Sequence, residues 1–229
     1  MDSNNIIIPA ILPKSFTDLK QHLVQMQGVA PLVQVDVVDG IFAPTKTWPY
    51  TGGDEFEKIV AQDEGLPFWE DIDFQFDLML ANPKDEMERF VQTGAASVIV
   101  HAMSPGAKEA LVLLQESRPI VSVGVAFLPS AAVADVQAFE GLYDFVQVMG
   151  IAEVGSQGKP FDTQTLFLVA ALRAARPELL IQIDGGVSLS NAEALVQAGA
   201  NRLVVGSAIF GAKDPVDAYK ALYTRVNAL

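Results

Sequence analysis

The stretch that most constrains the fold of this chain is residues 181–210, IQIDGGVSLSNAEALVQAGANRLVVGSAIF. Apolar and polar residues alternate over 181–184, as they do in a short strand. A capping-box pattern that begins at Ser190 predicts a helix ending at Gly199. Residues 202–205 then predict a second strand. The stretch therefore indicates a strand, a helix and a strand, with a glycine-containing turn after each strand.

Both turns of this stretch offer bare backbone amides. Gly185 and Gly186 follow the first strand, and Gly206 and Ser207 follow the second. Because glycine has no side chain, the backbone can approach an anion closely. A (β/α)8 barrel holds phosphorylated ligands at the turns after its last two strands. These four residues are therefore predicted to bind a phosphate group, although glycines needed only for packing would give the same pattern.

The same alternation of strand and helix patterns runs through the whole chain. Strands are predicted at residues 5–11, 32–38, 74–80, 97–101, 120–126, 143–149, 181–184 and 202–205. Helical patterns follow each of them, and the closing helix is predicted at 214–227. Eight strands and eight helices predict an α/β protein with the (β/α)8 TIM-barrel fold, in one domain over residues 1–229.

Composition excludes several classes of protein. The 28 acidic and 15 basic residues give a net charge of -13, which repels nucleic acid and anionic membranes. The absence of cysteine excludes disulfides, thiolate metal sites and cysteine nucleophiles. No apolar run approaches the roughly 18 residues of a membrane span, and the N-terminus lacks the pattern of a signal peptide. A cytoplasmic protein without an organic cofactor is expected.

Three aspartates stand near the C-terminal ends of predicted strands. Each follows a glutamine by two residues and so shares its face of the strand: Gln34 with Asp36, Gln75 with Asp77, and Gln182 with Asp184. Valines on the opposite face of the second strand are expected to meet the helices, which leaves the polar pairs in the barrel interior. Buried carboxylates are costly unless they are paired or used. A polar, water-filled barrel top is one interpretation, and proton transfer from two sides of a bound substrate is the other.

The chain resembles the ribulose-phosphate 3-epimerase family along nearly its whole length. The matching segments are PAIL at 9–12, VDVVDG at 35–40, DLML at 77–80, VHA at 100–102, VMG at 148–150, IDGGV at 183–187 and VGSAIF at 205–210. The resemblance implies an isomerase of the pentose phosphate pathway that inverts C3 of D-ribulose 5-phosphate through an enediolate. It also suggests a homo-oligomer.

The resemblance assigns roles to individual residues. Asp36 and Asp184 stand where the family carries its paired acid and base. Gly185, Gly186, Gly206 and Ser207 stand at the family's phosphate site. Met79 and Met149 match methionines around the reacting carbon, and His101 matches a histidine that we expect in the wall of the site.

The chain departs from the family at its metal site. The family binds a divalent metal with two histidines and two aspartates, and this chain has Gln34 and Asp77 in place of the histidines. Gln34, Asp36, Asp77 and Asp184 would form an all-oxygen site, which suits Mg²⁺ or Mn²⁺ better than Zn²⁺. Alternatively, the closeness of three acids keeps one carboxyl protonated. Ala10, Val38 and the loop at 150–161 depart as well.

Other activities of phosphate-binding barrels fit less well. A decarboxylase of the orotidine phosphate type needs a lysine where this chain has Val38, and a phosphoribosylanthranilate isomerase type uses a cysteine base. An epimerase for a different ketose phosphate and a catalytically silent sugar-phosphate-binding barrel both remain open alternatives.

Overall fold

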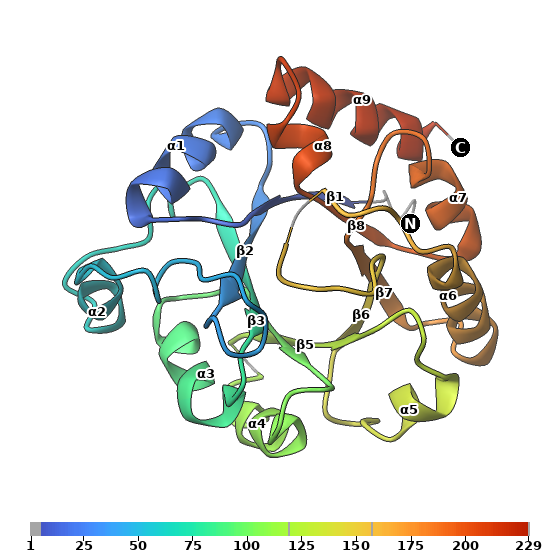
Figure 1. The fold of residues 1–229 in the computed structure, drawn as a ribbon, viewed down its shortest axis with the longest axis horizontal. Helices are drawn as coiled ribbons and strands as arrows, with labels where there is room; N and C mark the ends of the chain where they lie inside the picture. Colours follow the sequence, from blue (N-terminus) through green and yellow to red (C-terminus); the bar gives the residue numbers. More distant parts are fainter. Residues whose placement is uncertain (1–5, 119, 157, 229) are drawn as a thin grey trace.

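The computed structural model describes residues 6–118, 120–156 and 158–228. Eight parallel strands form a closed barrel in the order β1 to β8, with β1 paired to β8. In Figure 1 the helices surround this ring of strands. The predicted TIM barrel is therefore confirmed.

The strands lie close to their predicted positions. Asn5, where the first strand was expected to begin, lies outside the described residues. The strands are β1 Ile6–Ile11, β2 Leu32–Val38, β3 Asp73–Met79, β4 Ser97–His101, β5 Ser122–Phe127, β6 Phe145–Met149, β7 Leu180–Asp184 and β8 Arg202–Val205.

The described residues contain nine helices rather than eight, because a short extra helix follows β8. They are α1 Phe16–Met26, α2 Glu55–Val60, α3 Pro83–Gln92, α4 Ala107–Leu114, α5 Val133–Gln137, α6 Gln164–Ala175, α7 Ala192–Ala198, α8 Ser207–Phe210 and α9 Pro215–Asn227. None of the described helices is both long and apolar enough to cross a membrane.

The start of α7 corrects the prediction made from its sequence. The helix begins at Ala192, not Ser190, and Asn191 is its N-cap. The Asn191 side chain accepts a hydrogen bond from the Ser188 amide at 2.8 Å, while the Ser190 hydroxyl pairs with that of Ser188. The capping-box pattern was misleading because Asn191, not Ser190, is the N-cap, and its side chain accepts the hydrogen bond in this turn.

Alternation within the strands divides the molecule into an outer and an inner core. Val33, Val35 and Val37 of β2 belong to the large apolar core between strands and helices. The long segment between β2 and β3 contributes Trp48, which is fully buried against Phe16 and Phe56. Trp48 is therefore a packing residue. Because the apolar faces of the strands contact the helices, the polar faces point into the barrel interior.

Candidate active site

Two layers of polar side chains cross the barrel interior. Strand register sets Asp36 beside Asp77 and sets Asp184 beside Met149, in a layer near the C-terminal ends of the strands. One step deeper lies a layer of four fully buried glutamines, Gln34, Gln75, Gln147 and Gln182. Because β2 pairs in register with β3, and β6 with β7, the side chains of each layer lie side by side on these adjacent strands.

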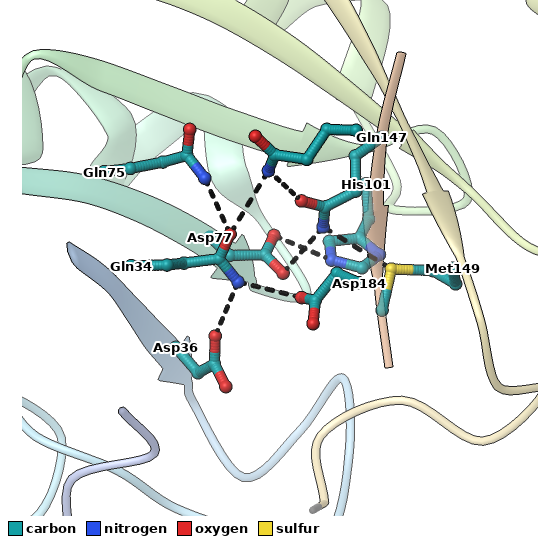
Figure 2. A network of polar contacts seen from close by, with 9 residues as sticks. Gln34, Asp36, Gln75, Asp77, His101, Gln147, Met149 and Asp184 are labelled. Atoms are coloured by element: carbon teal, nitrogen blue, oxygen red, sulfur yellow. Dashed lines mark hydrogen bonds and ion pairs between the residues drawn. The ribbon is translucent and has the colours of Figure 1, made fainter. Parts of the chain in front are cut away.

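Gln34 connects the two carboxylates that the sequence predicts to be catalytic. Its Nε2 donates to Asp36 Oδ1 and to Asp184 Oδ2, both at 2.8 Å (Figure 2). Its Oε1 accepts from Gln75 Nε2 at 2.7 Å, and Ser97 Oγ donates to Gln75 Oε1 at 3.0 Å. This chain of hydrogen bonds turns the Gln34 amide so that a donor faces the carboxylates.

Asp77 is held from two other strands. His101 Nε2 lies 2.9 Å from Asp77 Oδ1, and Gln147 Nε2 donates to Asp77 Oδ2 at 3.0 Å (Figure 2). Gln182 Nε2 in turn donates to Gln147 Oε1 at 2.6 Å. His101 and Asp77 are both buried, so this contact is an interior pair rather than a surface ion pair.

The three carboxylates are close enough to affect one another. One oxygen from each of Asp36, Asp77 and Asp184 lies within 4.8 Å of the others. Burial, followed by the charge of Asp77, raises the pKa of Asp184 to about 7, against opposing effects of the Gln34 hydrogen bond and His101. Asp184 can therefore keep its proton near neutral pH, in line with the expectation that one of three close acids stays protonated.

Threonines hold the ends of two strands that carry the site. Thr47 Oγ1 donates to the Asp36 carbonyl oxygen at 2.9 Å and accepts from the Val38 amide at 2.8 Å. Thr165 Oγ1 donates to the Met149 carbonyl oxygen at 3.0 Å. Both threonines are buried, which fixes the backbone beneath Asp36 and Met149.

The ends of β6 and β7 approach each other closely. The Gly150 amide donates to the Asp184 carbonyl oxygen at 2.6 Å. A Cβ atom at position 150 would lie 1.9 Å from the Gly185 carbonyl oxygen. Only glycine fits here, because the contact is with backbone that cannot move aside. This approach sets the Gly185–Gly186 turn against the end of β6.

A single pocket joins the carboxylates to the predicted phosphate site. Asp36, Asp184, Met79 and Met149 line it together with all four turn residues, Gly185, Gly186, Gly206 and Ser207. His101 is not among the residues that line this pocket, and its Nε2 contacts Asp77 instead. Its predicted place in the wall of the site stays a prediction.

The loop between β6 and α6 supplies pocket residues that the sequence analysis missed. Gly155, Ser156, Gly158 and Lys159 line the same pocket. In Figure 1 the described part of this gold segment lies across the middle of the ring of strands. Gln147 was also missed, although its alternation with Phe145 and Met149 would have placed it on the interior face of β6.

The acidic cluster suits a hard divalent cation. Asp36, Asp77 and Asp184 offer oxygen ligands of the kind that Mg²⁺ and Mn²⁺ prefer, and the cluster lacks the imidazole or thiolate ligands usual for Zn²⁺. Gln34 faces the two aspartates with its NH₂ group, and its carbonyl is occupied by Gln75. As a ligand it would have to reverse its amide, so here it supports the carboxylates instead.

Comparison with known proteins identifies a family and individual relatives that are similar to this chain in sequence. A sequence model of the ribulose-phosphate 3-epimerase family matches residues 6–210. The ribulose-phosphate 3-epimerase of Aquifex aeolicus is 31% identical over 217 residues, which cover 91% of each chain. The chloroplastic ribulose-5-phosphate-3-epimerase of Arabidopsis thaliana is 28% identical over 96% of this chain and 76% of its own.

Solved structures of similar shape are more distant in sequence. A 3-hexulose-6-phosphate synthase has a TM-score of 0.68 at 20% identity, covering 96% of this chain and 99% of the synthase. KGPDC from Streptococcus mutans has a TM-score of 0.68 at 13% identity, with 98% of each chain covered. At these identities the likeness shows the fold.

Proposed function

Because the chain belongs to the ribulose-phosphate 3-epimerase family, we propose that it inverts C3 of D-ribulose 5-phosphate to give D-xylulose 5-phosphate. Membership makes the protein an enzyme of the isomerase class. The main support for this reaction is a single pocket, which Asp36 and Asp184 line together with the turn at Gly185 and Gly186.

The two aspartates supply the base and the acid. Ionised Asp36 removes the proton from C3, which lies next to the C2 carbonyl, and leaves an enediolate. Protonated Asp184 then returns a proton to C3 from the other face, which inverts the stereocentre. The reverse reaction exchanges the two roles. The raised pKa of Asp184, about 7, supports this division because one acid must hold a proton while the other does not.

Gln34 suits this exchange because it binds both carboxylates through one NH₂ group. Its two N–H bonds reach Asp36 and Asp184 at equal distances of 2.8 Å. An amide does not titrate, so Gln34 holds both groups in place before and after the proton moves. We assign Asp77 no part in the transfer, since it does not line the pocket that Asp36 and Asp184 share.

A divalent metal fits the proposed chemistry. Asp36, Asp77 and Asp184 would hold it, with Mg²⁺ or Mn²⁺ favoured over Zn²⁺ by their oxygen ligands. When bound, such an ion would supply positive charge beside the oxygens of the enediolate. The residues of the chain supply the rest. Met79 and Met149 form apolar walls next to the acids and keep water from the reacting carbon.

Deuterium exchange tests the proposal. With D-ribulose 5-phosphate in D₂O, we expect deuterium to enter C3 and D-xylulose 5-phosphate to form, both followed by NMR, with and without added Mg²⁺ or Mn²⁺. A reaction without protein is the control. Binding of the sugar phosphate without exchange would show a silent binding barrel. If exchange occurred with another ketose phosphate and not with D-ribulose 5-phosphate, the proposed substrate would be wrong but the proposed proton transfer would stand.

A further inference from the structure

We infer that Lys159 determines the specificity of the enzyme for phosphorylated sugars by binding the phosphate group of the substrate. The inference rests on the proposed function, which it extends from the backbone turns to a charged side chain of the loop between β6 and α6. The turns offer only amides and a hydroxyl, whereas Lys159 offers a full positive charge.

Lys159 lines the pocket that contains the glycine turns. It lines the pocket with Gly186, Gly206 and Ser207, the turn residues that the phosphate is proposed to meet. Among the described residues that line this pocket, Lys159 is the only basic one. The acids Asp36 and Asp184 line the same pocket, so the lysine gives it charges of both signs.

The charge of the pocket explains why a cation is needed there. Asp36 and Asp184 line it, and one oxygen of Asp77 lies within 4.8 Å of theirs, in a chain of net charge -13. A sugar phosphate adds up to two further negative charges to this environment. Neutral amides orient a phosphate but do not offset its charge, and lysine is a common point-charge ligand for phosphate.

In the structure Lys159 is paired with a neighbour from its own loop. Its Nζ lies 2.8 Å from Glu153 Oε2, and the two side chains are 41% and 78% exposed. Glu153 and Lys159 also line a second, outer hollow of the loop. Exposed ion pairs contribute little free energy, so a phosphate group can replace Glu153 as the partner of the lysine.

Three variants test the inference. Lys159→Met removes the charge at nearly constant length, Lys220→Met removes an exposed lysine from α9 as a matched control, and Glu153→Gln removes the competing partner. With D-ribulose 5-phosphate we expect Lys159→Met to raise KM about 10- to 100-fold while kcat stays within about twofold. Lys220→Met should leave both constants unchanged, and Glu153→Gln should lower KM.

Two further measurements separate phosphate recognition from general damage to the site. With unphosphorylated D-ribulose, Lys159→Met and the wild type should have equal kcat/KM. Calorimetric titration with inorganic phosphate should show the same loss of affinity without turnover, so it still tests the lysine if no epimerisation occurs. Equal phosphate affinities of Lys159→Met and Lys220→Met, or no phosphate binding by the wild type, would overturn the inference.

Discussion

The two ends of the pocket are built in different ways. At the acidic end, side chains from strands are fixed by a buried network, as with Gln34, Asp36 and Asp184. Elsewhere in the pocket, Gly186 and Lys159 belong to a turn and a loop, and Lys159 pairs with an exposed neighbour, Glu153. Under the proposed function, the chemistry depends on residues of the strands, whereas substrate selection depends on residues of turns and loops. Four predictions test it.

The largest expected effect comes from the acidic end. Asp184→Asn and Asp36→Asn keep the shape of each side chain but remove the group that carries the proton. Each should lower kcat about 10³- to 10⁴-fold, and deuterium should no longer enter C3. Stopped assays with D-ribulose 5-phosphate would measure the loss, and phosphate affinity should be unchanged. Activity within tenfold of the wild type in either variant would exclude that residue from proton transfer.

The second prediction concerns pH and stability. Since the pKa of Asp184 is raised to about 7 in the fold, the native state binds the proton more tightly than the unfolded chain does. Its contribution to stability is present at low pH and is lost as pH rises to about 7. Without divalent ions, the difference in unfolding free energy between Asp184→Asn and wild type should grow over this range, by up to about 4 kcal/mol.

Urea unfolding at several pH values would measure this difference. The wild-type curve alone is not sufficient, because the net charge of -13 also weakens the fold at high pH. A difference between the two proteins that is constant with pH would show that Asp184 has an ordinary acidity.

The third prediction concerns the turn end. Gly186 has φ +65°, and a Cβ there would lie 2.8 Å from the Phe161 Cα atom. Gly186→Ala should cost about 1–3 kcal/mol of stability and raise KM for the sugar phosphate about tenfold, with kcat less affected. Gly28→Ala is the matched control, since Gly28 has φ +69° and no atom within 4 Å. Equal KM values for Gly186→Ala and Gly28→Ala would show that this turn does not bind the phosphate group.

The smallest effect is expected beneath the acids. Gln147→Leu removes one donor to Asp77 and leaves the Gln182 amide without its 2.6 Å acceptor. The variant should lose about 1–3 kcal/mol of stability and only a few-fold in kcat. Gln137→Leu, on the surface of α5, is the control for the change in polarity. A loss of kcat as large as that of Asp184→Asn would place Gln147 in the chemistry itself.

The difference between strands and loops also decides what the sequence could predict. Period-2 alternation identified the barrel and the interior faces that carry Asp36, Asp77 and Asp184, because a strand leaves a side chain only two directions. The orientation of the Gln34 amide depends on Gln75, which is 41 residues away, so no local pattern reveals it.

Loops lack such a period. Lys159 could not be assigned to the pocket from its sequence position, because its place depends on where the β6–α6 connection crosses the barrel. The contact of His101 with Asp77 was not predicted, since the direction of a side chain at a strand end is set by its partners. The Ser190 pattern failed because Asn191 competes for the same turn.

The layer of four glutamines beneath the acids has a practical consequence. Histidines in such a place change charge between mildly acid and neutral solution, and they attract soft metals. Carboxamides do neither, so the floor of this active site keeps the same charge and hydrogen-bonding pattern in any ordinary buffer. An enzyme with such a floor should respond to acidity through groups other than these four amides.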